Sequence, residues 1–200
     1  MSEYWNHNAA YHPWILRHAA RHPRGRALDI GCGDGLLVRR LADAGLEVVG
    51  IEPDPSAAAR AHARVAETPR ASIRQVDLAS LDEPRRSFDL VCMVATLHHM
   101  DARTALARAV DLLRPGGTLL VVGLSANRSI ADWTFSAVTL PIVRLGSLAH
   151  GETRDIGVPT APAHESLADI RTVAAEFLPG ARIPRGLYYR YLLSWDAPNV

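Results

Sequence analysis

The sequence predicts a mixed α/β fold in which a mostly parallel sheet carries helices on both faces. Two observations support this fold class. Short apolar runs alternate with helical patterns along the first 125 residues, as in a parallel sheet built from βαβ units. The first apolar run, 26–31, leads directly into a glycine-rich turn, and right-handed crossovers place such a turn at the ligand-binding edge of the sheet.

The expected elements follow the chain in order. Apolar runs predict strands near 26–31, 46–51, 71–76, 88–94 and 118–124, and helical periodicity predicts helices near 35–44, 55–67 and 102–113. Asp54 or Ser56 is the expected N-cap of the second helix, and Asp101 that of the third. Pro115 is expected to end the third helix, and Gly116–Gly117 to make the turn into the fifth strand.

The C-terminal third is less regular. Ile130–Leu148 is largely apolar and is interrupted by Pro141, and a loop pattern follows, so we expect a variable lid or substrate segment at 126–164. Ser166–Leu178 returns to a helical pattern, with Ser166 as its cap and Pro179–Gly180 as its stop. Residues 181–195 are expected to form two short strands around Arg185–Gly186.

Length and composition predict a single cytoplasmic domain. Two hundred residues suffice for one substantial core, and 48% hydrophobic with 22% charged residues is ordinary for a globular protein. No apolar run reaches about 18 residues, so no membrane span is expected. The first residues lack the layout of a signal peptide, and Cys32 and Cys92 are both expected at buried strand ends.

The charge pattern argues against a nucleic-acid partner. All 22 basic residues are arginines, they are dispersed along the chain, and the net charge is only +1. Nucleic-acid-binding domains usually carry a basic patch or stripe. The nine histidines are scattered and show no metal-ligand spacing such as H-E-x-x-H. We therefore expect a small-molecule substrate and no metal site.

The segment Ala27–Gly35 carries the strongest functional signal. An apolar strand runs into three glycines at alternate positions, Gly31, Gly33 and Gly35, whose missing Cβ atoms let the backbone approach a ligand. Glu52 ends the next apolar run, where a carboxylate can accept hydrogen bonds from both hydroxyls of a ribose. Strand, glycine turn, helix, strand and acid together predict a nucleoside-binding βαβ unit.

Two classes of cofactor use such a unit. The nicotinamide fingerprint is G-x-G-x-x-G, whereas the third glycine here, Gly35, comes one residue early. Asp34 also places negative charge where a pyrophosphate would approach. The D-I-G-C-G-D-G form instead resembles motif I of class I S-adenosylmethionine-dependent methyltransferases, whose cofactor has no phosphate and carries a sulfonium cation. An NAD(P)-dependent oxidoreductase is the alternative.

Three further segments extend this resemblance over residues 26–125. Asp77 ends the third predicted strand, where the acid of the family meets the adenine amino group. Phe88–Met100 resembles motif IV, whose strand end faces the reacting methyl, and Leu112–Val122 resembles the helix, turn and strand that follow it. The Asn/Asp-Pro-Pro-Tyr/Phe tetrapeptide of methyltransferases that act on base amino groups is missing, since Val94–Leu97 stands there.

The resemblance implies a Rossmann-like, mostly parallel seven-stranded sheet with a C-terminal antiparallel hairpin. It implies one domain over residues 1–200, divided into an N-terminal cap helix (1–25), a cofactor-binding core (26–125), the variable segment (126–164), and the last helix and hairpin (165–200). S-adenosylmethionine is the implied cofactor. The implied cofactor-binding residues are Asp29, Gly31, Cys32, Gly33, Glu52, Pro53, Asp77, Leu78 and Val94, with Tyr11 or His12 on the methionine carboxylate.

Methyl transfer from a sulfonium is an in-line displacement, so holding acceptor and methyl in line supplies much of the catalysis. A base is needed only if the acceptor must lose a proton. His98 and His99, just past motif IV, are the candidates, unless both are structural or only orient the substrate. The expected activity is methylation of oxygen or nitrogen in a small molecule, by a monomer or homodimer. A non-catalytic regulatory or scaffold protein that binds S-adenosylmethionine is the second alternative.

Overall fold

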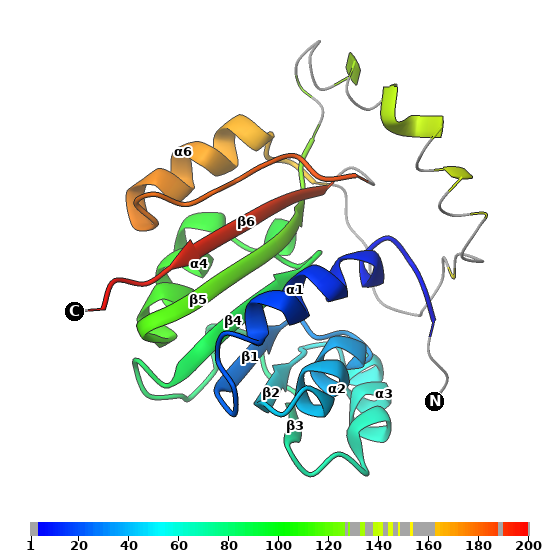
Figure 1. The fold of residues 1–200 in the computed structure, drawn as a ribbon, viewed down its shortest axis with the longest axis vertical. Coiled ribbons are helices and arrows are strands. Elements are labelled where there is room, and N and C mark those ends of the chain that lie inside the picture. Colours follow the sequence, from blue (N-terminus) through cyan, green and yellow to red (C-terminus); the bar gives the residue numbers. More distant parts are fainter. Residues whose placement is uncertain are drawn as a thin grey trace.

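A computed structural model describes residues 4–126, 163–187 and 190–199, together with scattered positions between 128 and 153. Its described strands form one sheet in the order β3-β2-β1-β4-β5-β6, and only β6, which pairs with β5, runs antiparallel (Figure 1). The strands are β1 (Arg26–Ile30), β2 (Glu47–Ile51), β3 (Ala71–Arg74), β4 (Phe88–Val94), β5 (Leu113–Leu124) and β6 (Arg190–Asp196).

Three of the helices begin where a capping side chain accepts from a backbone N–H group of the first turn. Asp54 accepts from the Ala57 amide at 2.7 Å, and Asp101 accepts from the Thr104 amide at 2.8 Å, which confirms both expected caps. Ser166 forms a capping box with Asp169. The described helices are η1 (Ala9–Tyr11), α1 (His12–Ala19), α2 (Leu36–Asp43), α3 (Pro55–Val65), η2 (Leu97–His99), α4 (Ala102–Leu112) and α6 (Leu167–Phe177).

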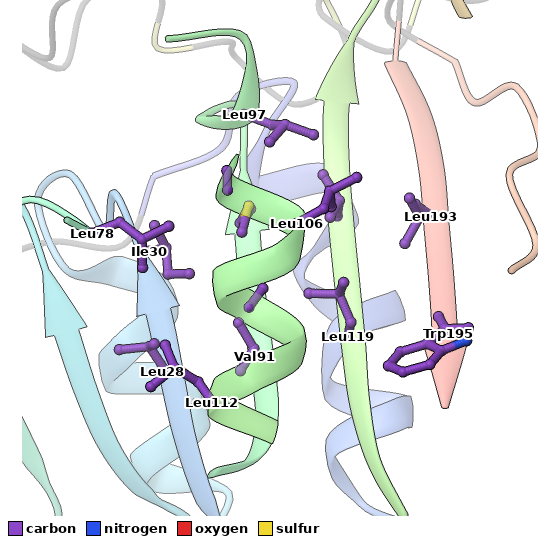
Figure 2. Close-up of a cluster of buried hydrophobic side chains, with 14 of the residues drawn as sticks. Leu28, Ile30, Leu78, Val91, Leu97, Leu106, Leu112, Leu119, Leu193 and Trp195 are labelled. Atoms are coloured by element: carbon purple, nitrogen blue, oxygen red, sulfur yellow. The ribbon is translucent and has the colours of Figure 1, made fainter. Parts of the chain in front are cut away.

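The core lies on both faces of the sheet. Helices α1, α2 and α3 pack on one face, and α4 and α6 on the other. Figure 2 shows the second layer, in which Leu106 and Leu112 of α4 lie against the strands, with Leu97 at one end of the cluster. Burial of the central parallel strands on both faces explains why their sequences are nearly continuous apolar runs. The parallel strands therefore end together at one carboxyl edge, where the glycine turn lies.

The structure confirms the predicted mostly parallel α/β sheet with an antiparallel pair at its C-terminal end, although the described residues form six strands rather than seven. The segment before β6 contacts it at two isolated bridges, Arg182 to Ser194 and Arg185 to Tyr191. Pro184 lies between these bridges. Its carbonyl accepts from the Leu192 amide at 3.0 Å, but proline has no N–H to return the bond, so the ladder is interrupted there.

Two strand boundaries also differ from expectation. β3 ends at Arg74, because the chain turns as the Val76 amide donates to the Arg74 carbonyl. β5 begins at Leu113, directly after α4, rather than at residue 118. Most of the variable segment 126–164 lies outside the described residues. Within the part of the chain that is described, no helix is long and apolar enough to cross a membrane.

Candidate functional site

The glycine turn follows β1 and is fixed to the end of β2. The amides of Gly31 and Cys32 both donate to the Ile51 carbonyl, at 2.8 and 3.0 Å. Gly31, Gly33 and Gly35 all have positive φ angles, of 68°, 56° and 79°. Residues with a Cβ resist this left-handed conformation, which explains why three glycines stand here. Gly35 is also the N-cap of α2, so the turn ends at the start of a helix.

Glu52 spans the space between the glycine turn and the start of α3. The side chain is buried, and its two carboxylate oxygens accept from the amides of Gly33 at 2.9 Å and Asp54 at 3.0 Å. These two bonds fix the carboxylate at the carboxyl end of β2. Each oxygen has a second lone pair, which is the acceptor that a ribose hydroxyl requires.

Asp29, in β1 just before the glycine turn, is a second acidic residue at this site. It is 2% exposed, and its Oδ1 has no hydrogen-bond partner among the described residues. Burial, together with the nearby Glu52 carboxylate, raises the pKa of Asp29 to about 7. A buried carboxyl with an open acceptor, beside a second carboxylate, suits a ligand that brings positive charge. S-adenosylmethionine brings a sulfonium and an ammonium group, so these residues fit that cofactor.

The raised pKa of Asp29 predicts how stability depends on pH. Between about pH 4 and 7 the folded protein keeps a proton on Asp29 that the unfolded chain has lost, so stability falls as pH rises through this window. In Asp29→Asn, urea unfolding is expected to show a smaller loss of stability between pH 5 and 7 than in the unmodified protein. Identical losses in the two proteins would contradict the assigned burial and charge of Asp29.

The other predicted cofactor residues differ in their surroundings. Asp77 is exposed, and a hydrogen bond at 2.7 Å from the Ser80 amide holds the pKa of its carboxyl below the usual value. Leu78 belongs to the core, whereas Pro53 is exposed before α3. Burial raises the pKa of the Cys32 thiol, which disfavours the thiolate and fits a small filler residue. Contact of these four residues with the cofactor stays a prediction.

The end of β4 brings the two histidines to the same edge of the sheet. β4 lies beside β1 and ends at the half-buried Val94, after which the chain turns into η2. The rings of His98 and His99 lie 4.1 Å apart, with His98 half-buried and His99 exposed. The hydroxyl of Thr96 lies 3.3 Å from the Gly31 carbonyl oxygen, so this turn contacts the glycine turn directly.

Tyr11 and His12 make contacts within the protein. The Tyr11 hydroxyl donates to the Leu187 carbonyl at 2.7 Å, which joins the N-terminal segment to the chain before β6. His12 is buried against α2, and its Nδ1 lies 3.0 Å from a guanidinium nitrogen of Arg40. Burial, and then the Arg40 charge, lower the pKa of His12 to about 3, so it is neutral near pH 7. Contact of either side chain with the methionine carboxylate stays a prediction.

The sequence reasoning missed a buried ion pair that anchors the glycine turn. Arg64 of α3 donates to the Asp34 carboxylate at 2.6 Å and to the Asp34 carbonyl at 2.9 Å. The Tyr4 hydroxyl donates to the other carboxylate oxygen at 2.9 Å. In the sequence, Asp34 was informative only as a charge unsuited to pyrophosphate. No periodicity or spacing singles out Arg64, which lies thirty residues further along the chain.

Comparison with known proteins agrees with this arrangement. A family model described as a methyltransferase domain matches residues 28–119. An uncharacterized methyltransferase of Mycobacterium tuberculosis is 34% identical over 201 residues, which cover 99% of this chain and 100% of that protein. A ubiquinone biosynthesis O-methyltransferase of Acinetobacter baylyi is 26% identical, over 100% of this chain and 87% of its own length.

Solved structures share the fold. The PH0226 protein of Pyrococcus horikoshii superposes with a TM-score of 0.69 at 17% identity, over 94% of this chain and 87% of that one. A SAM-dependent methyltransferase of Aquifex aeolicus gives 0.64 at 15% identity, over 92% and 88%.

The sheet, the glycine turn and the acid after β2 define an α/β enzyme that binds a nucleoside cofactor. Together with the relatives they place it among the methyltransferases. The chain belongs to the class I S-adenosylmethionine-dependent methyltransferase family, and S-adenosylmethionine is its cofactor.

Proposed function

We propose that this enzyme methylates a hydroxyl oxygen of a small molecule, with nitrogen as the second possible acceptor atom. The main support for this proposal is the position of the His98–His99 turn, which contacts the glycine turn through Thr96. A hydroxyl must lose its proton on methylation, and imidazole is a base suited to neutral pH. The similarity to an O-methyltransferase over the whole chain supports the same choice of atom.

The geometry of the site suggests a role for each of its polar residues. S-adenosylmethionine supplies an electrophilic methyl group. We assign Glu52 to the ribose hydroxyls, because its carboxylate is already fixed by two amides. We assign Asp29 to charge balance with the cationic end of the cofactor, because its Oδ1 is buried with an open acceptor position. One of the two histidines then accepts the proton of the acceptor hydroxyl.

The acceptor is tested by transfer of a radiolabelled methyl group to a panel of small molecules. The panel contains a catechol, a simple phenol, a primary amine and a thiol, each incubated with the enzyme and labelled S-adenosylmethionine. The proposal expects label in a hydroxylated acceptor. Label only in the amine would move the function to N-methylation, and label only in the thiol would contradict both choices.

The histidines are tested by single glutamine variants. We expect either His98→Gln or His99→Gln to lower kcat by about 100-fold or more, as the loss of a general base does. The matched control is His62→Gln, an exposed histidine on α3. Normal turnover in both variants would remove the base assignment and leave the methyltransferase assignment standing.

A further inference from the structure

The chain leaves β4 through a strained residue. Ala95 has a φ angle of 53°, in the left-handed region that residues with a Cβ resist. Its amide donates to the Val122 carbonyl of β5 at 2.7 Å, which holds it in place. The hydrogen bond to the sheet therefore holds a left-handed residue just before the histidine turn, Leu97–His99. Strain that the surrounding structure maintains is common at functional sites.

Thr96 fills the space that Gly31 leaves open. A Cβ atom on Gly31 would overlap the Thr96 Cγ2 methyl first and would lie 2.6 Å from the Oγ1, closer than side-chain atoms approach. The same hydroxyl lies 3.0 Å from the Val94 carbonyl oxygen and 3.3 Å from that of Gly31. The single hydroxyl hydrogen is therefore shared between the end of β4, where the contact is shorter, and the glycine turn. The two segments interlock through a side chain that is small, branched and polar.

The histidine turn is fixed on its other side by the core. Leu97 is 1% exposed and lies at one end of the apolar cluster, as Figure 2 shows. The His99 amide donates to the Thr96 carbonyl at 3.0 Å, and the Met100 amide to that of Leu97 at 3.1 Å. The histidine rings are therefore carried on a short turn with two anchors, the Leu97 side chain and the Thr96 hydroxyl.

We propose that Thr96 is a positioning residue, whose hydroxyl holds the histidine turn in register with the glycine turn that carries the cofactor. The inference rests on the proposed function, in which a histidine meets the acceptor. In-line transfer depends steeply on geometry, and a displacement of about 1 Å is enough to cost 100-fold in rate. We assign the role to the hydroxyl rather than to the Cγ2 methyl that packs against the same glycine, because only the hydroxyl can hydrogen-bond to the Gly31 carbonyl.

The test compares the unmodified enzyme with Thr96→Val, which keeps the branched shape, and Thr96→Ser, which keeps the hydroxyl. Calorimetry with S-adenosylhomocysteine measures binding, and hydrogen exchange of residues 94–100 in the same complexes measures the order of the histidine turn. We expect Kd values within about three-fold of each other. In Thr96→Val the His99 and Met100 amides are expected to exchange about five-fold faster, as for the loss of one hydrogen bond. Thr96→Ser is expected to match the unmodified enzyme.

The remaining outcomes overturn the inference in distinguishable ways. Unchanged exchange in Thr96→Val would show that the hydroxyl does not hold the turn, with the cofactor assignment intact. Equal acceleration of the amides of α3 would mean that Thr96 supports the whole fold rather than this turn. Failure of the unmodified enzyme to bind S-adenosylhomocysteine would defeat the proposed function itself, and calorimetry reveals this before any exchange is measured.

Discussion

Replacing Gly31 with alanine is expected to lower the free energy of unfolding by about 3 kcal/mol and to abolish binding of S-adenosylmethionine. Two costs add up at this position. The φ angle of 68° costs a residue with a Cβ about 1–2 kcal/mol, and the new Cβ would overlap the Thr96 side chain, with about 1–3 kcal/mol for such overpacking. Relief of the overlap would shift the turn that carries the cofactor.

The matched control for this prediction is Gly180→Ala, after α6. Gly180 has a φ angle of 80°, but a Cβ there would meet no atom within 4 Å. This variant therefore measures the backbone cost alone, about 1–2 kcal/mol, and should leave cofactor binding unchanged. Adding Thr96→Ala to Gly31→Ala should recover part of the lost stability. Urea unfolding measures the free energy of unfolding of each variant. Equal losses in Gly31→Ala and Gly180→Ala would contradict the close contact between Gly31 and Thr96.

Replacing Arg64 with methionine is expected to cost about 3–5 kcal/mol, because it leaves the Asp34 carboxylate buried without its cation. The two side chains are 2% and 7% exposed, and their charged atoms lie 2.6 Å apart. Adding Asp34→Asn to the variant removes the stranded charge and should restore part of the stability. Urea unfolding near pH 7 measures each step.

An exposed ion pair of similar length provides the control for Arg64. Arg85 lies 2.7 Å from Asp111, but the two side chains are 74% and 43% exposed. Water screens such a pair, so Arg85→Met is expected to cost only about 0–1 kcal/mol. If both arginine variants lose the same stability, the Asp34–Arg64 pair is not the buried anchor of the glycine turn that we describe.

Much of the fold could be predicted because its determinants are local. Buried parallel strands appear in the sequence as apolar runs. Three helix starts are marked by the N-cap residues Asp54, Asp101 and Ser166. The edge of the sheet that holds the site follows from strand direction alone, which brings Gly31, Glu52 and His98 to one end.

The features that were missed depend on contacts between distant segments. Thr96 meets Gly31 across 65 residues, and Arg64 meets Asp34 across 30, so no local pattern records either contact. The number of strands in the described sheet differs from the expected seven for another reason. Two short strands were expected over residues 181–195. Pro184 alone was enough to interrupt the backbone hydrogen bonds between them.

The central claim, that Glu52 and the glycine turn bind S-adenosylmethionine, is tested most directly by calorimetric titration of the purified protein. The ligands are S-adenosylmethionine, S-adenosylhomocysteine and NADH, and the proteins are the unmodified enzyme, Glu52→Gln and the exposed control Glu67→Gln. Micromolar binding of both adenosyl ligands but not of NADH is expected, with a loss of about 100-fold in Glu52→Gln alone. Binding of NADH without the adenosyl ligands, or full affinity in Glu52→Gln, would contradict the account.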